Sequence, residues 1–167
     1  MTSGSPSSAP TAFQDLMPGN YCWGCGPTVK TGLRLKSRWV GDEVVCDWTP
    51  RPEFAAGPRH ILYGGIISAV MDCHSIWAAI ATTYREDARE VGSEPLVWYV
   101  TGLLKVSYHK PTPIDLPLTL TSRVERVDGR KSTVTCSLVS DGEERAIGEM
   151  LAVRVPLKWF EPRTHGS

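Results

Sequence analysis

The hydrophobic positions of this chain are concentrated in one long segment, from His60 to Thr82, which only a few polar residues interrupt. The length of this segment and the glycine pair near its start predict a helix over about residues 64–84. Because the helix is hydrophobic nearly all round, other elements of the fold must cover it.

Shorter segments on both sides of the helix have the composition of β-strands and are separated by turn signals. Gly41-Asp42 is typical of a tight turn, and Val127-Asp-Gly-Arg130 and Ser140-Asp-Gly-Glu143 are typical of hairpins. The predicted strands cover about residues 32–40, 43–48, 97–109, 116–127, 131–139 and 144–155. One long helix with an antiparallel sheet of five to six strands is an α+β arrangement, and a curved sheet wrapped around the helix would bury it.

The two ends of the chain differ in composition from the rest. Residues 1–18 are rich in Ser, Pro, Gly and Thr, which predicts a disordered N-terminal tail. Residues 158–167 are expected to form a C-terminal tail, which leaves residues 19–157 as one domain. The N-terminus has neither the basic nor the apolar segment of a signal peptide.

The charge balance argues against two classes of partner. The chain has 18 Lys and Arg against 18 Asp and Glu, so neither nucleic acid nor an anionic membrane is expected as a partner. Asp72 and His74 interrupt the only candidate membrane span. The cysteine count is odd, which suits a reducing compartment, and a cytoplasmic location is predicted.

A stripe of small and polar residues follows one face of the predicted helix. Gly65, Ser68, Asp72 and Ser75 share this stripe at 3.6 residues per turn. A carboxylate among apolar neighbours is costly to bury unless it is used or paired. The stripe is therefore either a ligand-facing surface, or a place where Ser68 or Ser75 holds Asp72 by hydrogen bonds without any chemistry.

Three stretches carry a resemblance to a known family: Tyr63-Gly-Gly65 followed by Asp72, Cys22-Trp-Gly-Cys-Gly-Pro27 leading to Gly32-Leu-Arg-Leu35, and Val100 to Pro113. Together they resemble the hotdog-fold acyl-CoA thioesterases, and in particular the PaaI-like branch. The resemblance covers most of the chain. It departs at Tyr63, where the family usually has a histidine.

The resemblance implies an enzyme that hydrolyses the thioester of an acyl- or aryl-CoA to the free acid and CoA, without a cofactor. The N–H groups of Gly64 and Gly65 would polarise the thioester carbonyl at the positive end of the helix. Asp72 would act as the nucleophile or as the general base for a water molecule. Thr101 lies where relatives have a Ser or Thr that positions the water, although an ordinary strand threonine is the alternative.

The spacing of these groups predicts a dimer. Gly64 and Asp72 are separated by eight residues, or roughly 12 Å along a helix. Two groups acting on one carbonyl must each lie about 3 Å from it, so one helix cannot supply both. Two antiparallel helices about a two-fold axis could, which predicts a homodimer with shared active sites, and a dimer of dimers is the larger assembly considered.

Further residues are candidates for substrate binding. Ser68 and Ser75 line the stripe, and Tyr63 either donates a hydrogen bond near the carbonyl or, as we favour, fills the space of the usual histidine. Many relatives have an amide side chain shortly before the glycine pair, a position for which His60 is a candidate substitute here. Arg130 and Lys131 flank a hairpin and are candidates for the CoA phosphates, with a solvated turn as the alternative.

The cysteines raise the question of a metal. Cys22-x-x-Cys25 is a ligand pair, but a structural zinc site needs four ligands and the chain has no second such pair. Because Cys46, Cys73 and Cys136 fall on separate predicted elements, no metal is expected. Cys73 and His74 also cannot form a triad with Asp72, since adjacent helical residues point about 100° apart.

Two other functions compete with hydrolysis. One is a non-catalytic hotdog module that binds acyl-CoA or acts as an oligomeric partner, in line with the tyrosine at position 63. The other is a hotdog hydratase, for which the chain has no matching Asp/His motif.

Overall fold

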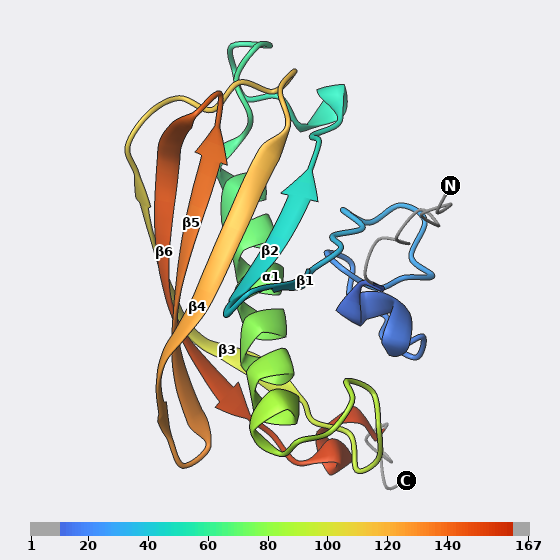
Figure 1. The fold of residues 1–167 in the computed structure, drawn as a ribbon. Helices are drawn as coiled ribbons and strands as arrows, with labels where there is room; N and C mark the ends of the chain where they lie inside the picture. The colour runs from blue at the N-terminus through green and yellow to red at the C-terminus, as the bar shows by residue number, and fades with distance from the viewer. Residues whose placement is uncertain (1–10, 162–167) are drawn as a thin grey trace, which may run out of the picture.

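The computed structural model describes residues 11–161 and consists of one antiparallel sheet curved around one long helix. The sheet has the strand order β1-β2-β4-β5-β6-β3, so that β1 and β3 form its edges. This arrangement confirms the predicted α+β hotdog class (Figure 1). The strands are β1 (Arg38–Val40), β2 (Glu43–Trp48), β3 (Tyr99–Tyr108), β4 (Leu118–Asp128), β5 (Lys131–Ser140) and β6 (Glu143–Arg154).

The turns between neighbouring strands are made by the predicted residues. Gly41, Gly129 and Gly142 have φ values of +60°, +58° and +68°, in the left-handed region that glycine adopts without steric cost. Asp141 has a φ of +54°, so both central residues of the β5–β6 turn are left-handed, as in a type I′ hairpin. These short turns fix the antiparallel register of the sheet.

Helix α1 (Gly64–Glu86) crosses the inner face of the sheet and carries much of the core. Val70, Met71 and Ala78 are fully buried. Among the described residues, α1 is the one helix long and apolar enough to cross a membrane by length and composition. Its most apolar window is 61% buried inside the protein, as in the core helix of a soluble protein.

The N-terminal segment differs from the prediction of a tail over residues 1–18. Residues 1–10 lie outside the described part, but Phe13–Leu16 form a 3₁₀-helix, η1, beside α1 on the side away from the sheet (Figure 1). Phe13 is 5% exposed and its ring stacks on Trp77 of α1, with centroids 6.4 Å apart. The Gln14 side chain also accepts a hydrogen bond from the Ser37 N–H. The packed region therefore begins before residue 19, because a few large apolar residues are hidden in a polar composition.

The first predicted strand is shorter than expected. The sequence predicts residues 32–40, whereas β1 contains only Arg38–Val40. Leu33 and Leu35 are buried, but their N–H groups donate to the carbonyls of Trp23 and Gly24 instead of to a neighbouring strand. The hydrogen-bonding partner of this segment is therefore the loop around Cys22, and not another strand.

Two short helical turns complete the described chain. Pro52–Phe54 form η2 before helix α1, and Leu157–Phe160 form η3 after β6. The predicted C-terminal tail of residues 158–167 thus starts within η3, and residues 162–167 lie outside the described part.

Candidate active site

Asp72 lies in the middle of α1 and faces the edge strand β3. It is partly buried, and its Oδ1 accepts a hydrogen bond of 2.5 Å from the Thr101 hydroxyl. Burial raises the pKa of Asp72 above its usual range, while the Thr101 hydrogen bond acts in the opposite direction. The hydrogen-bond partner of the carboxylate is therefore Thr101. The sequence had also allowed Ser68 or Ser75 as this partner.

The start of α1 presents unused hydrogen-bond donors. Ile66 and Ile67 donate to the carbonyl of Tyr63, the N-cap residue. Within residues 11–161, no acceptor is found for the N–H groups of Gly64 or Gly65. The first N–H groups of a helix have no partner inside the helix, and together with the dipole they favour a negatively charged oxygen.

A small hydroxyl network links the helix start to β3. Tyr108 donates from its hydroxyl to the Gly64 carbonyl over 2.8 Å, and Ser68 hydrogen-bonds to the Tyr108 hydroxyl over 2.7 Å. The Tyr63 side chain is 57% exposed and lies against Gly65, where an added Cβ would stand 2.4 Å from the ring. A side chain at position 65 would therefore require the Tyr63 ring to move.

Tyr108 was missed by the sequence analysis. Thr101 and Tyr108 are seven residues apart, so strict alternation would place them on opposite faces of β3. The pairing of β3 with β6 shifts in register between Thr101 and Leu103, and this irregularity changes the alternation so that both side chains reach α1. No signal in the sequence marks this shift apart from Gly102.

The other predicted binding residues are spread over the molecule. Ser75 is only 1% exposed, so it does not share the surface of Asp72. His60 is exposed in the loop before α1. Arg130 and Lys131 are exposed at the β4–β5 hairpin, which lies at the opposite end of the sheet from the start of α1 (Figure 1).

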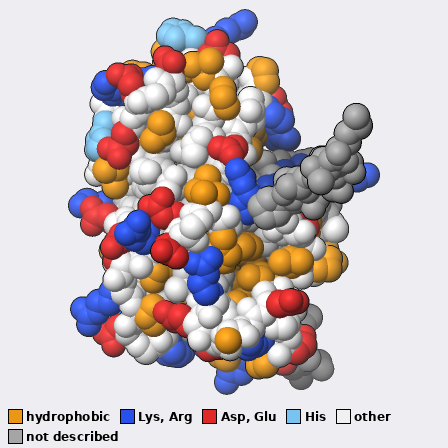
Figure 2. All heavy atoms as spheres, viewed as in Figure 1, with side chains coloured by type: hydrophobic (Ala, Val, Ile, Leu, Met, Phe, Trp, Pro, Cys, Tyr) orange, Lys and Arg blue, Asp and Glu red, His pale blue; other side chains and the backbone are white. Residues whose placement is uncertain are grey.

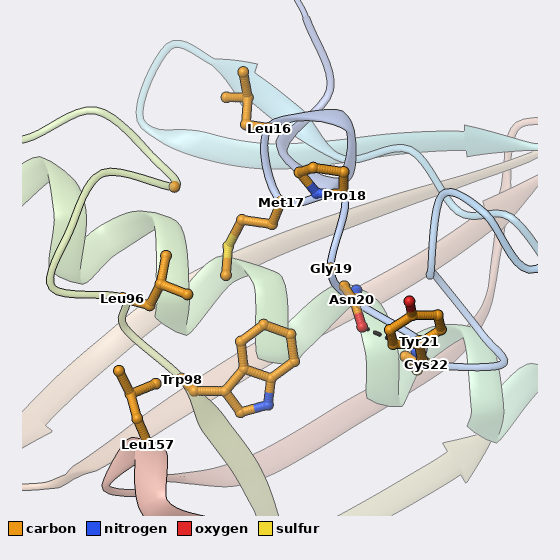
Figure 3. Close-up of a pocket in the computed structure, with 11 residues that line it drawn as sticks. Leu16, Met17, Pro18, Gly19, Asn20, Tyr21, Cys22, Leu96, Trp98 and Leu157 are labelled. Atoms are coloured by element: carbon orange, nitrogen blue, oxygen red, sulfur yellow. Dashed lines mark hydrogen bonds between the residues drawn. The ribbon is translucent and has the colours of Figure 1, made fainter. Parts of the chain in front are cut away.

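A mostly apolar pocket of about 760 Å³ lies between residues 16–22 of the N-terminal segment and the residues that lead into β3, Leu96 and Trp98. The side chains of Met17, Leu96 and Trp98 line it, and Cys22 closes one end (Figure 3). In Figure 2, hydrophobic side chains gather on the side where the N-terminal segment lies. The full lining comprises Leu16, Met17, Pro18, Gly19, Asn20, Tyr21, Cys22, Gly92, Leu96, Trp98 and Leu157.

Cys22 connects this pocket to the carboxylate. It contacts Cys73, the residue after Asp72, with 3.6 Å between the two sulfurs. Cys22 therefore joins the lining of the pocket to the residue that follows Asp72 in α1.

The expectation that Cys73 stands apart from Cys22 and Cys25 is wrong. The Sγ atoms of all three residues lie within 4.8 Å of one another. The loop between residues 20 and 35 folds back over α1, and sequence separation gave no indication of this contact. His74, by contrast, is packed as predicted: it is fully buried between Ser37 and Val44, and burial lowers its pKa to about 4.

Comparison with solved structures identifies the family. A thioesterase superfamily protein from Shewanella loihica is 31% identical, with a TM-score of 0.60, and the match covers 73% of this chain and 91% of that protein. The chain belongs to the thioesterase superfamily. No protein-family model and no curated protein matches it.

More distant structures share the fold. The PaaI protein of the phenylacetic acid degradation operon of E. coli is 13% identical with a TM-score of 0.60, covering 74% of this chain and 81% of that protein. A thioesterase from Haemophilus influenzae is 10% identical with a TM-score of 0.61, covering 80% and 84%. These two likenesses concern the hotdog fold alone.

Proposed function

We propose that this protein is an acyl-CoA thioesterase that hydrolyses acyl- or aryl-CoA to the free acid and CoA. The observation that carries the proposal is the Asp72 carboxylate, which is partly buried and hydrogen-bonded to Thr101. The Shewanella loihica protein, 31% identical to this chain, is described as a thioesterase superfamily protein. Family membership and a carboxylate of raised pKa support the same reaction class.

Asp72 acts in this reaction as the nucleophile or the general base. As a base, it takes a proton from a water molecule whose oxygen attacks the thioester carbonyl, and Thr101 orients the carboxylate. As a nucleophile, it forms an acyl-enzyme anhydride that water then hydrolyses. In both routes the carbon–sulfur bond breaks and CoA leaves as the thiolate, which then takes up a proton.

The oxyanion is stabilised by the helix start of a second protomer. Gly64 and Asp72 of one chain are roughly 12 Å apart along α1, too far to act on the same carbonyl. Strand β3 is an edge of the sheet, and Leu103 on it is 62% exposed, which supports a homodimer formed along this edge. The N–H groups of Gly64 and Gly65 from one protomer then face Asp72 of its partner, and such dimers can pair into tetramers.

Other residues of the chain are candidates for binding the acyl group and the CoA phosphates of the substrate. The apolar pocket fits the acyl or aryl group, because most of its lining is hydrophobic. Antiparallel protomers would bring the hairpin of Arg130 and Lys131 toward the partner's helix start, where it would meet CoA phosphates. Further contacts with the substrate near the start of α1 are proposed for His60, Tyr63 and Ser68. A cytoplasmic location accords with free cysteines and with CoA as substrate.

A hydrolysis assay tests the proposal. Release of CoA is measured with short-chain, medium-chain and aromatic acyl-CoAs, with Asp72→Asn as the control that keeps the shape of the side chain. We expect turnover of at least one class by the wild-type protein and loss in the variant. Binding of acyl-CoA without any CoA release across the three classes would favour the non-catalytic module instead.

A further inference from the structure

We propose that Cys22, Cys25 and Cys73 form a binding site for one thiophilic divalent cation, with Zn²⁺ as the representative ion. Their three Sγ atoms lie within 4.8 Å of one another, and those of Cys22 and Cys73 are 3.6 Å apart. Sulfurs bound tetrahedrally to zinc at about 2.3 Å stand roughly 3.8 Å from one another. The three sulfurs are therefore already close to the spacing that a shared cation requires.

The loop that carries Cys22 and Cys25 is a tight turn. The two residues belong to a Cys-x-x-Cys-Gly turn in which the Gly26 N–H donates to the Cys22 carbonyl over 2.7 Å. The Cys22 N–H donates to the Asn20 side chain over 2.9 Å, which fixes the start of the same turn. The two cysteines are therefore held at the two ends of one tight turn, with the spacing of a Cys-x-x-Cys ligand pair.

The third ligand comes from the helix and depends on a glycine. A Cβ at Gly24 would stand 2.3 Å from the Cys73 sulfur, so the loop approaches α1 this closely only without a side chain there. The Cys25 sulfur accepts hydrogen bonds from the Trp77 indole N–H at 3.1 Å and from the Asn20 amide at 3.5 Å. Donors in a second layer orient metal-bound ligands and offset their charge.

The site has an open side. Cys25 and Cys73 are buried, whereas Cys22 is partly exposed and lines the apolar pocket. An ion can thus enter at Cys22, and the fourth tetrahedral position is left for water or another small ligand. Binding would replace three S–H bonds by three metal–sulfur bonds and release three protons to solvent, so no oxidant or reductant is involved.

The test uses the full-length protein, reduced and freed of metal by a chelator. One equivalent of Zn²⁺ should bind per chain by elemental analysis, and Co²⁺ in its place should give the thiolate charge-transfer absorption. Cys22→Ser, at the partly exposed position, and Cys73→Ser should each weaken Co²⁺ binding at least tenfold. Cys136→Ala is the matched control, because this buried cysteine lies in β5 outside the cluster, and it should keep full binding.

Two results would overturn the proposal. One is the absence of charge-transfer absorption in the reduced wild-type protein, or its persistence at full strength in Cys22→Ser. The other is a disulfide between Cys22 and either Cys25 or Cys73 that forms under air in preference to metal binding. The loss of two hydrogens in the intact mass would reveal it. Neither readout involves thioester hydrolysis, so the metal site and the proposed enzyme activity fail or stand separately.

Discussion

The Asp72 carboxylate is subject to two opposing influences, and their balance sets the pH range in which it can act. Burial raises its pKa, and the hydrogen bond from Thr101 favours the ionised form and lowers it, with burial the larger effect. Since attack on a thioester or on water requires the ionised carboxylate, the acid limb of kcat/KM should lie above pH 3.8, the ordinary pKa of aspartate.

Asp72→Asn should abolish turnover without unfolding the protein. The raised pKa means that ionisation is less favourable in the folded chain than in the unfolded chain. The carboxylate's contribution to stability is therefore complete below pH 3.8 and is lost as the pH rises through the folded-state pKa. At neutral pH the variant should keep or raise the Tm while hydrolysis falls by several orders of magnitude. Near-full activity in this variant would exclude Asp72 from the mechanism.

Thr101→Val should move the acid limb of the pH–rate profile. Valine keeps the shape of the side chain but removes the hydrogen bond that favours ionised Asp72, so the limb should shift to higher pH. The matched control is Thr119→Val, because Thr119 donates to Asp47 over 2.9 Å in a similar pair away from α1. Equal pH profiles for the wild type and both variants would show that Thr101 is an ordinary strand residue.

At the scale of elements, the N-terminal segment is part of the core. Phe13→Ala should lower the free energy of unfolding by about 3–5 kcal/mol, because it empties a buried site against Trp77. Leu16→Ala, in the same 3₁₀-helix but 43% exposed, should cost much less. Urea denaturation measures both. Similar small losses for the two variants would mean that residues 11–18 behave as the tail predicted from composition.

The long helix and the hairpin strands are predictable because their signals are local. The predicted helix start at residue 64 and the strand at 43–48 coincide with α1 and β2, and the glycine turns fall where expected. Features that depend on distant partners were not predictable. The burial of Phe13 requires Trp77, and the shortened first strand follows from pairing with the loop around Cys22.

The same limit applies to the candidate site. Asp72 and the glycine pair were proposed from motif and spacing and Thr101 from the family resemblance, and in the structure Thr101 is in direct contact with Asp72. Tyr108 was missed because a register shift in β3 reverses the alternation, and the contact of Cys73 with Cys22 was missed because it joins residues far apart in the chain.

At the scale of the whole molecule, each proposed active site is completed by a partner protomer. The test is activity after mixing two inactive variants, Asp72→Asn and Gly64→Pro. Tyr63 has a ψ of 129°, which is compatible with a following proline, so Gly64→Pro removes one N–H donor while keeping the helix. Gly64→Ala is its control: it keeps the N–H, and its Cβ would make an ordinary contact with Tyr108 at 3.5 Å.

The mixing experiment first requires that both variants fold, form dimers in light scattering and exchange subunits. A hybrid dimer then contains one site with both lesions and one with neither. With random exchange at equal amounts, half of the dimers are hybrids, so about a quarter of the wild-type activity should return. If exchange is demonstrated and no activity returns, the site is not shared between protomers, and the carbonyl must be polarised by some group other than the partner's helix start.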